Sequence, residues 1–255
     1  MKRITTLFAA TAACWTLFSC SKPLYRPESV HDPMIAGKNE VTASGSVLIM
    51  APYGFPSFDL GLGYSPVNRL AIKAAIRARS KADLYTTDSD DFRKTLNGTT
   101  VEGGLGYYAP IDDNMFFTVY ANLMWGHNQY HDYRVSDRHT DELLEYNYKA
   151  FGIQPAVVFV KQRARMSTGI RASLYQYDIR QAINTVTPDY YQVKEGKLYP
   201  VVEPYYAVEV GGKNIRFFGQ AGFSIVPSEL TTDSENIFPK LSIGINLRFG
   251  GMGKR

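Results

Sequence analysis

The sequence predicts an all-β, up-and-down antiparallel transmembrane β-barrel of about ten strands. Two observations carry this prediction. From residue 41 to residue 249, apolar and polar side chains alternate in successive segments, and a side-chain period of two suits strands and not helices. The connections between these segments alternate between short turns and long polar stretches, which is the loop asymmetry of membrane-spanning barrels.

The segment RARMSTGIRASL shows the alternation most clearly. Met166, Ile170 and Leu174 fall on one face of the expected strand, whereas Arg165 and Arg171 fall on the other. The same separation recurs along the chain. The strands expected on this basis are 41–49, 57–65, 69–79, 99–109, 114–126, 143–160, 163–177, 198–211, 214–226 and 239–249.

The connections sort by length. SPVN, PIDD, KQ and GGK follow the second, fourth, sixth and eighth strands as tight turns, whereas 80–97, 127–142 and 178–197 are long and polar. With an even number of strands, the long loops share one end of the barrel and both termini share the other. In outer-membrane barrels the short turns face the periplasm and the long loops face outside.

Residues 1–19 read as a lipoprotein signal peptide. MKRI is cationic, and LFAATAACWTLF is apolar but shorter than the roughly 20 residues of a membrane-spanning helix. The sequence Leu17, Phe18, Ser19, Cys20 resembles the lipobox of bacterial lipoproteins, so Cys20 is the expected site of lipid attachment. The alternative is an ordinary signal peptide with an incidental cysteine.

Residues 20–40 are expected to form a lipidated N-terminal tether. Pro23, Pro27 and Pro33 give this stretch an extended character. No acidic cluster follows Cys20, which favours a lipid that stays on the periplasmic side, next to the first strand. The barrel is assigned to residues 41–249, and residues 250–255 are assigned to a periplasmic tail.

Composition restricts the function. The chain has two cysteines, and after loss of Cys14 and acylation of Cys20 no thiol is left for a disulfide or a metal site. Removing Lys2 and Arg3 from the formal charge of +4 leaves +2, too small an imbalance to suggest a nucleic-acid partner. No catalytic or dinucleotide motif is present, so a non-enzymatic protein without a cofactor or a metal is expected.

The alternation over residues 41–249 resembles that of the small, porin-like outer-membrane β-barrels of Gram-negative bacteria, here with a lipoprotein signal. The last strand ends in Leu247, Arg248 and Phe249, similar to the aromatic-terminated signal by which such barrels are recognised for insertion. The resemblance implies contact with outer-membrane lipid and a protein partner in the cell envelope. It bears on architecture and not on activity.

The charged face of the strands is expected to line the interior, because a charged side chain facing the bilayer midplane costs about 2 to 4 kcal/mol. A barrel of about ten strands has little spare lumen, so a lumen plugged by ion pairs is favoured. The alternative is a small anion-conducting pore. The expected lumen charge network consists of Lys73, Arg77, Glu102, Arg165, Arg171, Glu203, Glu209, Arg216 and Arg248.

Aromatic side chains lie near the expected strand ends, which is typical of the aromatic belts at membrane interfaces. The alternative is packing at the rims of a soluble barrel. The residues expected in the belts are Tyr64, Tyr107, Tyr108, Phe116, Phe117, Trp125, Tyr175, Tyr177, Tyr199 and Tyr206.

Three function classes follow. The favoured one is a non-enzymatic outer-membrane barrel with a structural or partner-binding role through long extracellular loops. The second is a hydrolase at the outer rim, and the third is a soluble lipid-binding barrel with its apolar face inward. Acids and imidazoles that could serve a rim site, or hold a cation, are His127, His131, Asp132, Asp137, His139 and Asp141, with Asp88, Asp90 and Asp91.

Overall fold

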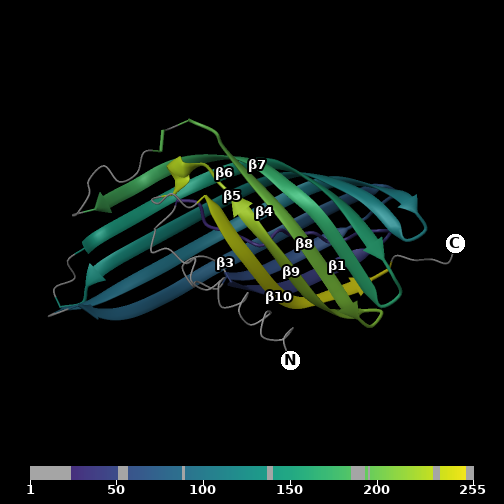
Figure 1. Cartoon of the computed structure of the whole chain (residues 1–255), viewed down its shortest axis with the longest axis horizontal. Helices are drawn as coiled ribbons and strands as arrows, with labels where there is room; N and C mark the ends of the chain where they lie inside the picture. The colour runs from purple at the N-terminus through teal and green to yellow at the C-terminus, as the bar shows by residue number, and fades with distance from the viewer. Residues whose placement is uncertain are drawn as a thin grey trace, which may run out of the picture.

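The computed structural model describes residues 24–50, 57–87, 90–136, 140–184, 193–194, 196–231 and 236–250. Ten antiparallel strands form a closed barrel in which each strand pairs with its neighbours in the sequence and β1 pairs with β10 (Figure 1). The predicted fold class is confirmed. The strands are β1 (Val41–Met50), β2 (Ser57–Tyr64), β3 (Leu70–Thr87), β4 (Asp90–Asp112), β5 (Met115–Arg134), β6 (Thr140–Val160), β7 (Ala164–Asn184), β8 (Tyr199–Gly211), β9 (Ile215–Ile225) and β10 (Ile237–Phe249), and a 3₁₀ helix, η1 (Ser228–Leu230), lies between β9 and β10.

The strands β3 to β7 are longer than the sequence pattern predicts. Much of the stretches 80–97 and 127–142, expected as loops, continues the sheet, and β3 pairs with β4 as far as Thr87 and Asp90. A strand needs only about 9 to 11 residues to cross a bilayer, whereas β4 has 23. Residues 127–134 of β5, for example, carry polar side chains on both faces, so the alternation of apolar and polar residues that marks a strand in the sequence is lost there.

The two ends of the barrel differ. We call the end with the short connections 65–69, 113–114, 161–163 and 212–214 the turn end, and the opposite end the loop end. β1 begins and β10 ends at the turn end, on the right of Figure 1, and the long strands β4 to β7 project at the loop end.

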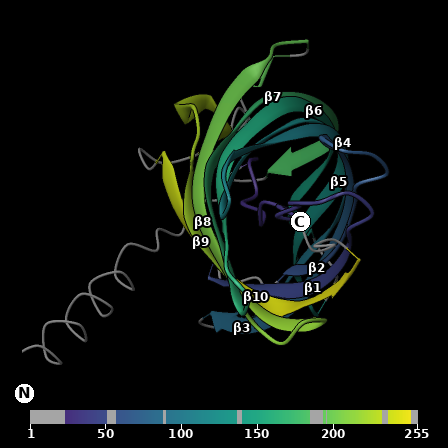
Figure 2. The ribbon, with the colours of Figure 1, turned by 90° about the vertical axis from the view of Figure 1, so that its right-hand side faces the viewer.

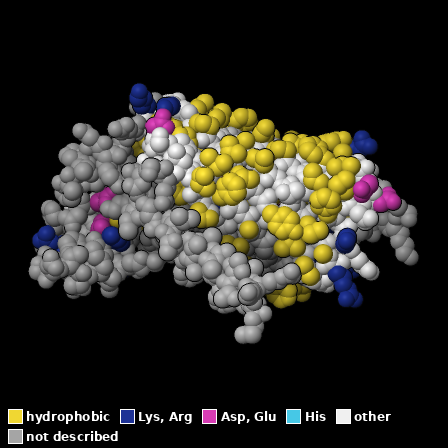
Figure 3. Space-filling model, in the orientation of Figure 1, with side chains coloured by type: hydrophobic (Ala, Val, Ile, Leu, Met, Phe, Trp, Pro, Cys, Tyr) yellow, Lys and Arg dark blue, Asp and Glu magenta, His cyan; other side chains and the backbone are white. Residues whose placement is uncertain are grey.

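The outer wall is apolar and the inner wall is charged. Leu60, Phe217 and Ile243 are 63%, 74% and 52% exposed, and Figure 3 shows hydrophobic side chains over the flank of the barrel with charged ones near its ends. Charged inward residues such as Lys73 and Arg171 are buried. This orientation is the reverse of a soluble lipid-binding barrel with its apolar face inward, so that alternative is wrong.

Among the described residues, no helix is long and apolar enough to cross a membrane.

Residues 24–40 run through the interior of the barrel, and we call them the luminal segment. Figure 2 shows their trace inside the ring of strands. At the loop end the N–H of Leu24 donates to the carbonyl of Leu230 at 3.1 Å, and at the turn end the N–H of Asn39 donates to Ser65 at 2.7 Å. Residues 24–40 of the expected N-terminal tether therefore lie inside the barrel. Residues 1–23, with Cys20, and residues 251–255 lie outside the described part of the chain.

Of the ten aromatic residues expected in belts, five lie on the outer face and five do not. Tyr64, Tyr107, Phe117, Trp125 and Tyr206 lie exposed on the outer face, as a belt requires. The other five occupy inward positions of their strands and are buried, because the period of two places them on the opposite face. These five are Tyr108, Phe116, Tyr175, Tyr177 and Tyr199.

The outward face can be tested by its depth-dependent intolerance of charge. Ile243 lies in the middle of β10 and Ile237 at its loop-end start, and both are more than half exposed. We expect Ile243→Lys to lower the free energy of unfolding in lipid by about 2 to 4 kcal/mol, and the matched control Ile237→Lys by about 0 to 1 kcal/mol. Denaturant titration in vesicles measures both, and equal losses would contradict the membrane-facing assignment.

Candidate functional site: the lumen and its N-terminal segment

All nine residues of the expected lumen network lie buried on the inner wall. Glu102 receives three cations: Lys73 Nζ and Arg77 Nη2 at 2.6 Å each, and Arg171 Nη1 at 3.2 Å. Arg171 Nε also donates to Glu203 at 2.5 Å. Because these charges are shielded from water, such direct pairing is what makes their burial tolerable.

Toward the turn end the network changes character. Arg248 donates to both carboxylate oxygens of Glu209 at 2.8 Å, a bidentate pair. Within the described part of the chain, Arg216 makes no hydrogen bond or ion pair, and its Nε and Nη1 atoms are buried. Lys240, which the sequence pattern did not single out, pairs with Glu203 at 2.5 Å.

Three carboxylates of the luminal segment complete the network. Glu40 binds Arg165 at 2.6 Å and Arg248 at 2.5 Å, so Arg165 finds its ion-pair partner on the segment. Glu28 lies 3.5 Å from Arg77 and accepts hydrogen bonds from Tyr148 and Thr100.

The third carboxylate, Asp32, meets hydroxyl groups instead of cations. It accepts from Ser167 at 2.5 Å and from Tyr205 at 2.8 Å.

The buried charges balance only when the segment is included. Among the described residues, the wall buries eight Lys and Arg against six Asp and Glu, an excess of two positive charges. The segment buries Glu28, Asp32 and Glu40 against Arg26, an excess of two negative charges. Since an uncompensated buried charge is strongly unfavourable, the segment acts as the counter-charge of the wall.

The backbone of the segment is also bound by the wall. The amide of Gln220 accepts from the N–H of Val30 at 2.9 Å and donates to its carbonyl at 2.7 Å, as a neighbouring strand would. Lys73 donates to the carbonyl of His31 at 2.8 Å, and Arg165 to that of Met34 at 2.5 Å. Wall side chains thus satisfy backbone groups that would otherwise be unpaired in the lumen.

Two glycines of β2 make room for the segment. A Cβ atom at Gly61 would collide with the ring of His31, and one at Gly63 would collide with Pro33. Both are inward positions, so larger residues there would compete with the segment for the lumen. The sequence did not indicate that these two glycines make room for the segment, because glycine occurs in strands for several reasons.

An aromatic cluster holds the segment at the loop end. The ring of Tyr25 packs edge-on against Tyr175, with centroids 5.6 Å apart, and its hydroxyl donates to Glu203 at 2.8 Å. Tyr146 donates to the carbonyl of Leu24 at 2.5 Å. Tyr175, Tyr177 and Tyr199, which were expected in the belts, therefore belong to the buried aromatic cluster that contains Tyr25.

The rim residues whose side chains the structure describes, His127, His131 and Asp132, do not converge on one site. Residues 127–134 belong to β5, so His131 and Asp132 point to opposite faces: His131 contacts Thr140 at 3.1 Å outside, whereas Asp132 is buried and lies 3.8 Å from Lys94. His127 contacts Asn147 at 2.9 Å. In the described part, no three His, Cys, Asp or Glu are grouped to hold a metal ion. Asp88, Asp137 and His139, and the side chains of Asp90, Asp91 and Asp141, lie outside what the structure describes.

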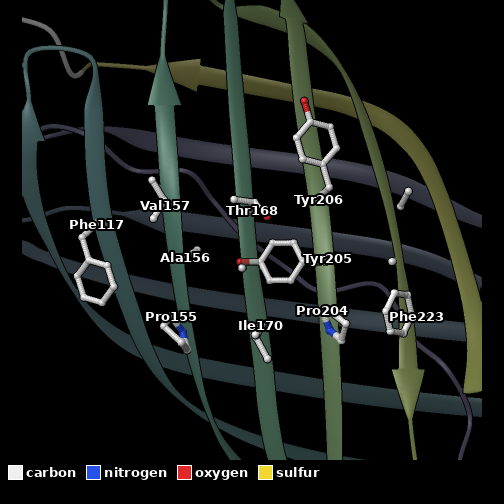
Figure 4. A pocket seen from close by; sticks show the side chains of 13 residues that line it. Phe117, Pro155, Ala156, Val157, Thr168, Ile170, Pro204, Tyr205, Tyr206 and Phe223 are labelled. Atoms are coloured by element: carbon white, nitrogen blue, oxygen red, sulfur yellow. The ribbon is translucent and has the colours of Figure 1, made fainter.

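A hollow of about 820 Å³ lies in the wall between β5 and β9. Figure 4 shows Pro155 of β6, Ile170 of β7 and Pro204 of β8 side by side along it. The two prolines interrupt the regular pairing of their strands, since proline has no N–H to donate. Tyr205, whose hydroxyl binds Asp32, faces the lumen behind this hollow. The outward lining is apolar and offers no constellation for catalysis.

A closed barrel with an apolar exterior and a charged interior defines a membrane-spanning β-barrel. No protein-family model matches the sequence, and no characterised protein matches it in sequence. Three solved structures have a similar barrel. An outer membrane channel from Pseudomonas putida F1 is 11% identical over 88% of this chain and 100% of that chain, with a TM-score of 0.43, and the outer membrane protease OmpT from Escherichia coli is 8% identical over 83% of this chain and 94% of that chain, with a TM-score of 0.45. The attachment invasion locus protein Ail of Yersinia pestis is 10% identical over 84% of this chain and 100% of that chain, with a TM-score of 0.34. So distant a likeness says nothing about activity.

Breaking the central ion pairs should cost far more than breaking an exposed one. We expect Arg171→Met to lower the free energy of unfolding by about 3 to 5 kcal/mol, because Glu203 and Glu102 lose a buried partner. Arg180→Met is the matched control, since Arg180 pairs with Asp178 in a setting where both side chains are more than half exposed, and should cost about 0 to 1 kcal/mol. Comparable losses of unfolding free energy for the two variants, measured by denaturant titration, would show that water solvates the charges in the lumen.

Proposed function

We propose that this protein is a non-enzymatic outer-membrane lipoprotein whose barrel is closed by its own luminal segment, and which presents its loop end to a partner. The observation that carries the proposal is the occupation of the lumen by residues 24–40, bound along their length to wall side chains. The barrel then serves as a rigid support instead of a pathway.

Closure is supported by how little space remains beside the middle of the segment. A cavity next to Ser29, His31 and Asp32 measures about 20 Å³, room for about one water molecule. Hydrated ions need a continuous aqueous path, which the segment and its ion pairs interrupt. The small anion-conducting pore is therefore the less favoured function, although the basic inner wall would give it the right selectivity.

Placement in the outer membrane is supported by the apolar exterior of a closed barrel and by the signal peptide with its lipobox cysteine. An acyl chain by itself gives only marginal membrane binding, whereas a spanning barrel is held by its whole apolar wall. Acylation of Cys20 would therefore add a local tether and would not be needed to keep the protein in the membrane.

The loop end is the part best suited to a partner. The hairpins of β4 to β7 continue the sheet beyond the length needed to cross a bilayer, so they present ordered strands with polar side chains. Lys197, between β7 and β8, forms an exposed ion pair of 3.0 Å with Glu229 of η1. A structural or partner-binding role in the envelope uses this surface directly.

Neutralising the segment should open the barrel. In the variant with Glu28→Gln, Asp32→Asn and Glu40→Gln, the wall keeps its excess of positive charge without compensation, so we expect anion-selective openings in planar lipid bilayers, with none in the wild type. Glu229→Gln is the matched control, because this carboxylate lies exposed near the loop end. Heat-modifiable gel mobility verifies that each barrel has folded. Steady conductance by the wild type, equal to that of the triple variant, would contradict closure.

A further inference from the structure

Because of the luminal segment, the N-terminal and C-terminal ends of the described chain lie at opposite ends of the barrel. An up-and-down barrel with an even number of strands keeps both termini at one end. Here the described chain starts at Leu24 near η1, at the loop end, and reaches β1 at the turn end only after passing through the lumen. Gly250, after β10, lies at the turn end.

The direction of the pass is fixed by contacts along two strands. β3 rises from the turn end to the loop end, and its Arg79, Arg77 and Lys73 bind Pro27, Glu28 and His31 in that order. The segment is therefore antiparallel to β3.

β10 gives the same direction independently, because it descends from the loop end to the turn end. Lys240, near the start of β10, donates to the carbonyl of Glu28 at 3.0 Å, and Arg248, near its end, binds Glu40 at 2.5 Å. The segment thus descends the lumen beside β10, and its N-terminal part lies at the loop end.

Chain length then restricts the position of Cys20. Four residue steps separate Cys20 from Leu24, and an extended chain spans at most about 3.6 Å per residue, or roughly 14 Å. The hydrocarbon core of a bilayer is about 30 Å thick. The four residue steps between Leu24, which is bound to Leu230, and Cys20 are therefore too short to reach back to the turn end.

We propose that the chain crosses the membrane once more than its strands do, through its own lumen, so that Cys20 and its lipid lie at the loop end. This rests on the proposed function in two respects: acylation of Cys20, and a loop end that faces outside. The diacylated cysteine then sits in the outer leaflet beside η1, opposite to the periplasmic position that the sequence favours. The segment is fixed at both ends, by β1 at the turn end and by lipid at the loop end.

A thiol-labelling experiment on intact cells tests the crossing. Lys22→Cys and Lys254→Cys each add one thiol to the full-length chain, near its N-terminal and C-terminal ends. With a membrane-impermeant maleimide we expect Lys22→Cys to be labelled fully on intact cells. Labelling of Lys254→Cys above that of the wild type, which accounts for any reaction at Cys20, should be absent on intact cells and appear on permeabilisation. Labelling of both thiols only after permeabilisation, or of both on intact cells, would overturn the proposal.

Acylation is read separately, by incorporation of labelled palmitate into the wild type and its loss in Cys20→Ala. If Lys22→Cys is labelled on intact cells but the wild type takes up no palmitate, the lumenal crossing stands and the lipid part of the proposal is rejected. If palmitate is incorporated but Lys22→Cys reacts only after permeabilisation, the lipoprotein assignment stands and the crossing is rejected.

Discussion

The structure depends on compensation of charge between the inner wall and the luminal segment. The sheet must turn its charged face inward because hydrocarbon covers the other face. The wall alone carries an excess of basic groups, and water in so narrow a barrel cannot solvate all of them. Glu28, Asp32 and Glu40 supply the missing negative charge from the luminal segment, which belongs to no strand. The segment is thus a structural member of the barrel.

This compensation shapes the wall itself. Gly61 and Gly63 leave space where the segment passes, and Gln220 replaces the hydrogen bonds that a neighbouring strand would make. Pro27 and Pro33 keep the segment extended without demanding N–H partners. The aromatic cluster around Tyr25 holds the segment at the loop end, and the ion pairs of Glu40 with Arg165 and Arg248 hold it at the turn end. Each of these features holds the segment against the inner wall.

The sequence predicted the strands and their facing because period two is a strong signal wherever one face meets hydrocarbon. Arg171 and Glu203 could be assigned to the interior on that ground alone. The position of residues 24–40 could not, because an extended proline-containing stretch has no periodicity and resembles a linker. The available hint was electrostatic: inward-facing basic residues outnumbered the acids on the wall, and Glu28 and Asp32 lay in the supposed tether. The continuation of β5 through residues 127–134 was missed for a related reason, since both faces of the strand are polar there.

The central claim, that residues 24–40 occupy the lumen of the folded protein, can be measured by cross-linking. The hydroxyl of Ser29 on the segment donates to Asp59 on β2 at 2.6 Å, so cysteines at both positions lie within reach of a short bifunctional thiol reagent. In membranes containing the folded, heat-modifiable barrel, the Ser29→Cys, Asp59→Cys double variant should be cross-linked nearly completely, and either single variant not at all. A folded barrel in which the double variant stays uncross-linked would show that the segment lies elsewhere.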